Sequence, residues 1–169
     1  MTSKDTVYRE TQAVMPSKII AAIVVLLLIV TGLFAYIYIS QEFLGREVGE
    51  NSIASHWALI IFIATALLTF YVSRLKIITR VDNNELVMSL GVIGKRKFPL
   101  DTIQTIRDYE GNPAADFLGY GYRIAIKQTG YIGRAEQAVS LKFKDEKREL
   151  VITTETPEEL KKTLKKPEE

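Results

Sequence analysis

Two long uncharged segments dominate the first half of the chain. Residues 19–40 carry no charged side chain, and residues 51–73 contain His56 as their only group that titrates near neutral pH. An α-helix rises about 1.5 Å per residue, so the 22 residues of the first segment extend about 33 Å. This length is enough to cross the ~30 Å hydrocarbon core of a bilayer. The pattern therefore predicts two membrane-spanning helices, over about 19–40 and 53–73.

Basic side chains flank this pair of helices on its outer sides. They are Lys4, Arg9, Lys18, Arg74, Lys76 and Arg80, whereas the connecting segment has only Arg46 among three glutamates. Lys and Arg near the ends of membrane helices stay on the cytoplasmic side. Both termini are therefore expected in the cytoplasm, and the protein is expected to be an integral, multi-pass membrane protein with two spans in the lipid bilayer.

After residue 74 the hydrophobic pattern changes from continuous runs to alternation, which is typical of strands with one buried face. In the strand expected at 122–128, Ile124 and Ile126 are expected to point inward, and the glycine-containing residues 129–133 are expected to form a turn. Seven short strands are expected in all, at about 74–82, 86–93, 96–100, 101–109, 122–128, 137–144 and 148–154.

A helix is predicted to close the chain. Thr156 is a favourable N-cap, Pro157 suits the first helical position, and Glu159 completes a capping box. Leu160 and Leu164 provide a narrow apolar stripe on which the helix can dock.

These elements define an α+β membrane protein, in which a two-helix transmembrane hairpin is followed by a seven-stranded antiparallel barrel and a C-terminal helix. That order of elements is the order of a pleckstrin-homology-like (PH-like) barrel. The expected division is a cytosolic N-terminal tail at 1–18, the hairpin at 19–73, a cytosolic PH-like domain at 74–166 and a tail at 167–169.

Several short motifs add to this pattern, at residues 90–94, 98–100 with Ile103, 119–123 after Asp116, 152–154 and 156–160. On these residues the chain resembles a family, the bacterial and archaeal membrane proteins in which a two-helix hairpin precedes a PH-like domain. It implies the plasma membrane of a prokaryote as the location, and it implies no reaction. PH domains that bind phosphoinositides place basic residues around the loop between their first two strands, whereas the loop taken as its counterpart here, 82–85, is acidic.

The composition excludes several kinds of chemistry. The chain of 169 residues has no cysteine, which excludes disulfides, thiolate metal sites and cysteine nucleophiles. Its single histidine, His56, is expected on the other side of the membrane from the domain, so no Ser-His-Asp triad is expected. Asp101, Asp108, Glu110 and Asp116 match no calcium-loop spacing. We therefore expect no enzyme activity, no catalytic residue, no cofactor and no metal. A formal net charge of +2 also argues against nucleic-acid binding.

Two sets of residues are candidates for binding. Tyr120, Tyr122 and Arg123 lie around Gly119 and Gly121, and aromatic and arginine side chains are enriched at protein interfaces. The alternative interpretation is that those glycines serve only a bulge or a close backbone approach, with the tyrosines packing on the barrel. The candidate contacts to anionic lipid are Arg74, Lys76, Lys95, Arg96 and Lys97, although a charged turn in solvent is the simpler interpretation of the last three.

The function expected from these observations is that of a membrane-anchored PH-like interaction module. It would present its cytosolic barrel to a protein partner or to a second copy of the chain, without catalysis. One alternative is a sensor of anionic lipid or envelope stress that acts through the basic residues. A second alternative is an accessory subunit of a membrane transporter or enzyme complex.

Overall fold

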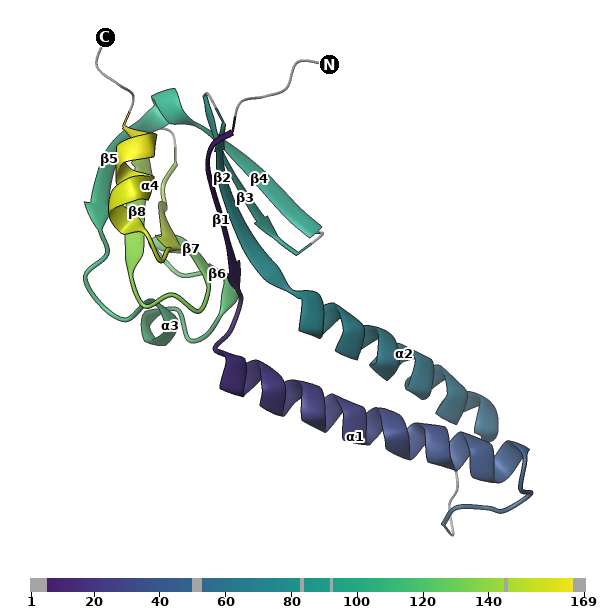
Figure 1. Cartoon of the computed structure of the whole chain (residues 1–169). Coiled ribbons are helices and arrows are strands. Elements are labelled where there is room, and N and C mark those ends of the chain that lie inside the picture. Colours follow the sequence, from purple (N-terminus) through teal and green to yellow (C-terminus); the bar gives the residue numbers. More distant parts are fainter. Residues whose placement is uncertain (1–5, 50–52, 83, 92, 145, 166–169) are drawn as a thin grey trace, which may run out of the picture. The chain divides into compact units, whose positions relative to one another are not determined.

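The computed structural model describes residues 6–49, 53–82, 84–91, 93–144 and 146–165. The chain forms two compact units, a helical unit at Ser17–Arg74 and a sheet unit made of Met1–Pro16 and Leu75–Glu169 (Figure 1). The expected tail at 167–169 lies outside the described residues.

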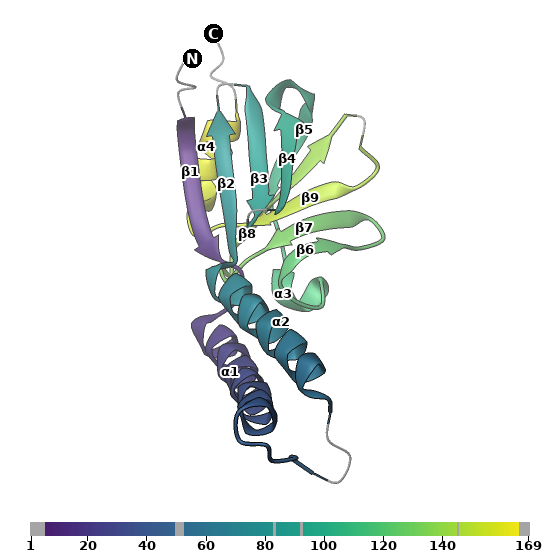
Figure 2. The same ribbon diagram turned by 90° about the vertical axis from the view of Figure 1, so that its right-hand side faces the viewer.

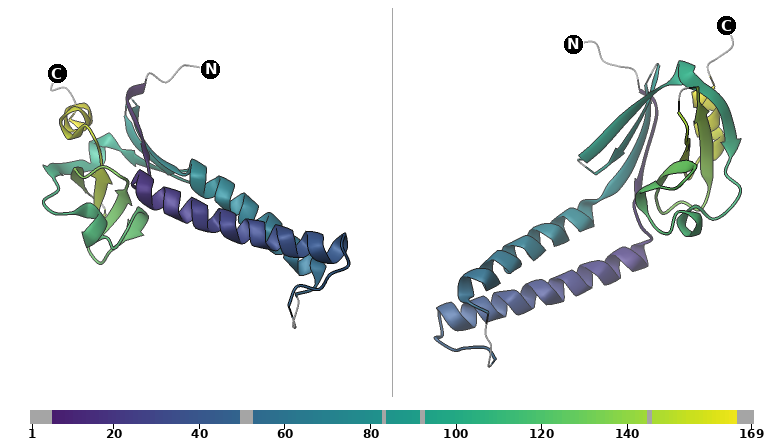
Figure 3. Two further views of the ribbon diagram at one scale, coloured as in Figure 1. Left: turned by 60° about the horizontal axis from the view of Figure 1, so that its bottom comes forward. Right: turned by 180° about the vertical axis from the view of Figure 1, so that it is seen from behind.

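The helical unit consists of two antiparallel helices that lie side by side, α1 (Ser17–Glu42) and α2 (Ser55–Arg74) (Figure 3). Their 26 and 20 residues correspond to about 39 and 30 Å. Each is long and apolar enough to cross a membrane, and within these two helices only Ser40 and Ala58 are buried. The prediction of two long apolar helices ahead of a sheet-rich domain is confirmed.

Four antiparallel strands form the first sheet, sheet A, in the order β1-β2-β3-β4 (Figure 2). The strands are β1 (Thr6–Ala13), β2 (Lys76–Asp82), β3 (Glu85–Leu90) and β4 (Ile93–Pro99). The expectation that residues 1–18 form a tail missed β1, which pairs with β2 from Ala13 opposite Lys76 to Thr6 opposite Asp82. Alternation could not reveal this strand, because the side chains at its inward positions include the polar Gln12.

The helical unit is therefore inserted between two neighbouring strands. Residues 14–16 connect β1 to α1, and Leu75 alone connects α2 to β2. The acidic turn at 82–85 consequently lies between the second and third strands of the sheet, so its assignment to the loop between the first two strands was wrong.

Five strands form sheet B in the order β5-β8-β9-β7-β6, and β7 runs parallel to β9. The described residues thus contain nine strands in two sheets, and the expected closed, wholly antiparallel barrel of seven strands is not what forms. The remaining elements are a 3-10 helix η1 (Leu100–Thr102), β5 (Ile103–Asp108), the short α3 (Pro113–Asp116), β6 (Gly121–Ile124), β7 (Gln128–Ile132), β8 (Ala138–Phe143), β9 (Glu149–Thr153) and α4 (Pro157–Leu164).

Strand β7 occupies the segment in which a turn was expected. Its central residue Gly130 suggested a turn, but this glycine serves packing instead. A Cβ there would lie 2.7 Å from the Cδ1 atom of Ile132 and 3.0 Å from the ring of Phe117. The backbone of β7 can approach Phe117 only because position 130 has no side chain.

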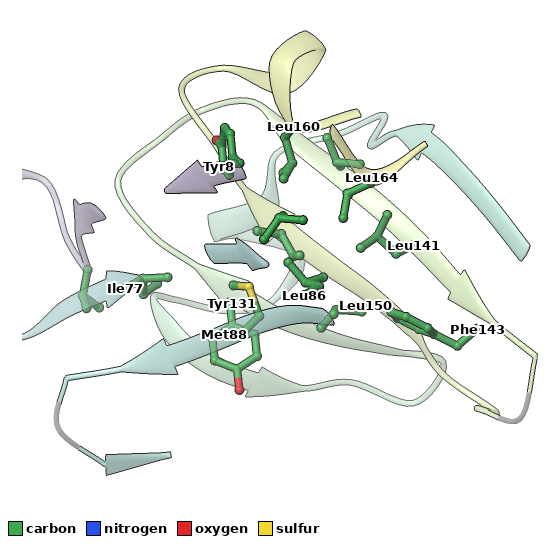
Figure 4. Close-up of a cluster of buried hydrophobic side chains, with 14 residues drawn as sticks. Tyr8, Ile77, Leu86, Met88, Tyr131, Leu141, Phe143, Leu150, Leu160 and Leu164 are labelled. Atoms are coloured by element: carbon green, nitrogen blue, oxygen red, sulfur yellow. The ribbon is translucent and has the colours of Figure 1, made fainter. Parts of the chain in front are cut away.

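The two sheets and α4 share one hydrophobic core (Figure 4). Leu160 and Leu164 of α4 are buried in it, as predicted. The predicted capping-box bond is absent, because the Thr156 hydroxyl lies 2.9 Å from the Tyr8 hydroxyl instead of capping the helix. The buried members of the core are Tyr8, Val14, Ile77, Val81, Leu86, Met88, Tyr131, Val139, Leu141, Phe143, Leu150, Ile152, Leu160 and Leu164.

Polar side chains of β1 form hydrogen bonds with the last residue of β9 and with the segment that connects β9 to α4. The Tyr8 and Thr154 hydroxyls both donate to Glu10 Oε2, at 2.6 Å each. The buried Gln12 amide donates to the Thr153 carbonyl at 2.5 Å. Because buried polar groups must be paired, these bonds specify the position of β1 against both sheets.

This arrangement predicts that the sheet unit requires β1 in order to fold. A variant that joins residues 6–16 to 75–165 through a short glycine-containing turn should show cooperative thermal unfolding by circular dichroism. Residues 75–165 alone should be less stable by at least about 3 kcal/mol, because Tyr8 and Val14 leave the core. Equal melting temperatures for the two variants would contradict this role of β1.

Candidate functional site

The basic run at 95–97 lies on β4, one of the two edge strands of sheet A. Successive side chains of a strand point to opposite faces, so Arg96 shares a face with Phe98. The Phe98 ring stacks on Phe143 of sheet B with 5.1 Å between the ring centroids, which identifies this face as the inner one. Lys95 and Lys97 therefore lie on the outer face, where the Lys97 ammonium donates to Glu85 Oε2 at 2.7 Å. The structure divides the three basic residues between two faces.

The segment that leads into β6 requires its two glycines for backbone reasons, as the simpler interpretation of them held. Gly119 has φ +132° and Gly121 has φ +92°, in the region that disfavours residues with a Cβ. A Cβ at Gly119 would also lie 2.9 Å from Arg123 Nη2, so the exposed Arg123 side chain folds back over this glycine. The Tyr120 and Tyr122 side chains pack against the core and are partly buried.

The two candidate sets, distant in sequence, meet at the edge of the sandwich. The Arg96 guanidinium carbon lies 5.1 Å from the centre of the Tyr122 ring, which is a cation–π distance. Tyr122 in turn packs on Tyr131 with 5.1 Å between ring centroids. Arg96, Tyr122 and Tyr131 are named here the Arg96–Tyr122 cluster, and they join β4 of sheet A to β6 and β7 of sheet B.

Burial controls the protonation of this cluster. It raises the pKa of the Tyr131 hydroxyl from 10.0 to about 12, and the nearby positive charge of Arg96 partly opposes this increase in the Tyr131 pKa. Tyr131 is therefore a neutral phenol at physiological pH. A surface cleft of about 390 Å³ adjoins Arg96; it is lined by Arg96, Lys97, Phe98, Pro99, Thr102, Phe143 and Glu146.

The remaining candidate lipid contacts belong to different units. Arg74 ends α2, and its guanidinium lies 5.1 Å over the Phe70 ring. Lys76 begins β2 and is exposed, and its carbonyl accepts from the Gly91 amide at 2.7 Å. This bond places Lys76 beside the turn that leads from β3 to Lys95.

Two of the four acidic residues that match no calcium-loop spacing are paired with neighbouring side chains. Asp108 pairs with Lys161 at 2.8 Å, and Asp116 accepts from the Tyr109 hydroxyl at 3.0 Å. Among the described residues, no group of three His, Asp or Glu side chains could hold a metal ion.

A surface that the sequence analysis missed lies around the turn between β6 and β7. Ile124 is 60% exposed and Ile126 is 92% exposed, so the expectation that both point inward was wrong. Strand β6 is one of the two edge strands of sheet B and ends at Ile124, and residues 125–127 connect it to β7. Together with Leu118, which is 89% exposed, these side chains form what we call the β6–β7 patch. Alternation alone could not reveal it, because alternation does not show which face is covered.

Comparison of the chain with protein-family models and with curated proteins gives no match.

The contact between Arg96 and Tyr122 can be measured by a double-mutant cycle. Arg96→Ala and Tyr122→Leu should show a coupling of about 0.5–1 kcal/mol in unfolding of the full-length protein, because each substitution removes the same cation–π contact. As a control, Lys95→Ala on the opposite face of β4 should add to Tyr122→Leu without coupling. Additivity in both cycles would contradict the contact.

The raised pKa of Tyr131 predicts a loss of stability in alkali. Because the folded state holds this proton more tightly, the stabilisation is complete below pH 10 and is lost as the pH rises to about 12. Tyr131→Phe should reduce the slope of stability against pH in this range by up to about 1.4 kcal/mol per unit. Tyr8 and Tyr109, whose pKa values are also raised to about 12, should retain the rest of the slope. Identical slopes for the two proteins would refute the assignment.

Proposed function

We propose that this protein is a membrane-anchored interaction module without catalytic activity. In this proposal α1 and α2 cross the bilayer as a hairpin, and the sheet unit lies on the cytosolic side of a prokaryotic plasma membrane. There it presents a surface to a protein partner or to a second copy of the chain.

The observation that carries the proposal is the pairing of β1 with β2. The strand before α1 and the strand after α2 are hydrogen-bonded neighbours in one sheet. Two strands on opposite sides of a bilayer cannot pair with each other. Both ends of the helical unit must therefore lie on one side of any membrane that it enters. Two spans satisfy this requirement, whereas a single span does not.

The surface of the helices supports insertion. Large apolar side chains are exposed along both of them, including Leu26, Ile29, Leu67 and Phe70. Apolar surface on this scale is unfavourable in water and is compatible with lipid. The basic residues on both outer flanks favour the cytosolic side for the sheet unit.

The architecture of the sheet unit supports a PH-like assignment. Two packed sheets and a C-terminal helix docked on their shared core support it, whereas the nine strands and the parallel pair of β7 with β9 depart from the expected seven-stranded antiparallel barrel. In this assignment β1 and β2 are the first two strands, so the membrane hairpin replaces the loop that carries basic residues in phosphoinositide-binding PH domains. The chain would therefore connect the sheet unit directly to its membrane-spanning helices at that position.

The Arg96–Tyr122 cluster and the adjacent Tyr120 and Arg123 form the proposed partner surface. Tyr and Arg dominate the energetics of many protein interfaces, because they combine apolar area with directed polar contacts. The Tyr122 ring holds the Arg96 side chain and so reduces the entropy that binding would cost.

A second candidate function is recognition of anionic lipid by the basic residues. The bond between Lys76 and Gly91 favours it, because it places Lys76 and the turn before Lys95 at the end of sheet A where the chain returns from α2. Cations near an anionic leaflet attract it by about 1 kcal/mol each.

Photocrosslinking in native membranes tests the module. A crosslinking amino acid at Arg123 should capture a defined product, either a partner or a second copy, whereas the same amino acid at the exposed Lys142 of β8 should not. In the same cells, a membrane-impermeant maleimide should label Glu47→Cys and should label Lys142→Cys only after permeabilisation. Equal products at both crosslinking positions, or external labelling of Lys142→Cys, would contradict the proposal.

A further inference from the structure

The β6–β7 patch exposes apolar surface that the sheet unit itself does not use. Leu118, Ile124 and Ile126 surround a cleft of about 470 Å³ that also contains Phe117. Leu118 is the only residue other than glycine with a positive φ, +54°, in the described part of the chain. A left-handed conformation is unfavourable for leucine. This conformation ends α3, because the Leu118 amide donates to the Ala115 carbonyl at 3.1 Å and the Gly119 amide donates to the Ala114 carbonyl at 2.8 Å. The Leu118 side chain is left exposed.

Cations border the patch. Lys127 follows Ile126 directly and is exposed, and the exposed Arg148 donates from Nε to the Ile126 carbonyl at 3.4 Å. The one acidic residue that lines the cleft, Asp116, accepts from the Tyr109 hydroxyl. An apolar tip with adjacent cations complements an interface that is apolar within and anionic at its surface.

The patch begins close to the point where the sheet unit joins α1. A Cβ at Gly121, the first residue of β6, would lie 3.9 Å from Val14, and Val14 is three residues before α1 begins. Leu118 precedes Gly121 by three residues, which span at most about 11 Å. Leu118 therefore lies close to the end of the sheet unit from which the chain continues into α1.

We propose that the β6–β7 patch is a second membrane contact, in which Leu118 and Ile126 enter the interfacial region of the bilayer and Lys127 and Arg148 bind anionic headgroups. This inference rests on the proposed function, in which α1 and α2 span that bilayer. It adds a non-covalent contact that restrains rotation of the sheet unit on its two short connections.

The composition of the patch favours lipid over protein as its occupant. Exposed apolar side chains next to the exposed cations Lys127 and Arg148 match a bilayer, which is apolar within and anionic at its surface. A contact of this small number of side chains is enough, because in the proposed function the helical unit already confines the sheet unit to the membrane surface and raises its effective concentration there.

The absence of cysteine from the chain permits a direct test with single-cysteine variants of the full-length protein. Leu118→Cys and Ile126→Cys, each labelled with a small fluorophore, are placed in vesicles that contain lipid-bound quenchers, one near the headgroups and one in the middle of the acyl chains. Leu28→Cys in α1 reports on the anchor, and Lys142→Cys on β8 is the exposed control. We expect quenching at 28, 118 and 126, and none at 142, with stronger quenching at 118 and 126 in anionic vesicles than in neutral ones.

Three results would contradict the lipid contact, and they distinguish its failure from the failure of the proposed function. Quenching at 28 with emission at 126 matching that at 142 would overturn the lipid contact and leave the anchor standing. Loss of quenching at 28 would overturn the proposed function and this inference with it. A blue-shifted, unquenched label at 126 together with crosslinked dimers would assign the patch to a second copy and also overturn the lipid contact.

Charge reversal supplies the matched comparison. The double variant Lys127→Glu with Arg148→Glu should bind anionic vesicles less through the β6–β7 patch. The ratio of membrane-bound to free patch should fall by about fivefold or more for each cation removed. Lys142→Glu with Lys144→Glu makes the same charge change elsewhere on the unit and should leave quenching at 126 unaltered. Equal quenching in the two double variants would refute the role assigned to Lys127 and Arg148.

Discussion

The fold depends on one strand pair, β1 with β2, whose partners are separated in sequence by the whole helical unit. Ala13 lies opposite Lys76, immediately before the chain leaves for α1 and immediately after it returns from α2. This pairing requires the two helices to return the chain to its starting point. It also connects each helix directly to a strand of the same sheet, since only residues 14–16 and Leu75 intervene. Hydrogen bonds from β1 to the segment after β9 extend this constraint to the second sheet.

The packing of the two sheets then determines where chemically useful side chains meet. Strand β4 is an outer strand of sheet A, and Phe98 anchors it to sheet B through Phe143. Arg96, two residues earlier on the same face, consequently reaches Tyr122. The cluster is thus a product of sheet packing and strand alternation, and it involves no long-range charge pair. Lys97, on the other face, is paired locally with Glu85.

Both proposed binding surfaces depend on where side chains are placed and exposed, and neither requires a chemical reaction. Tyr131 is held as a neutral phenol by burial, which suits a packing role beneath Tyr122. Arg96 is ordered by a ring, whereas Leu118 and Ile126 contact little of the unit that carries them. An ordered cation and an uncovered apolar tip suit different partners, a folded surface for the first and lipid for the second.

The sequence by itself determined the elements whose signals are local. Uncharged runs of helical length specify α1 and α2, Thr156 and Pro157 mark the beginning of α4, and each of the seven expected strands overlaps an observed one. Tertiary structure alone decided the rest. Strand β1 has the polar Gln12 at an inward position, which hides its alternation. Gly130 suggests a turn in the sequence, whereas in the structure it leaves room for the Phe117 ring to pack on β7. Alternation placed Ile124 on one face of a strand, but whether a second sheet covers that face depends on residues far away in the chain. The meeting of Arg96 with Tyr122 has the same origin, because contacts across a sandwich are set by how its sheets pack.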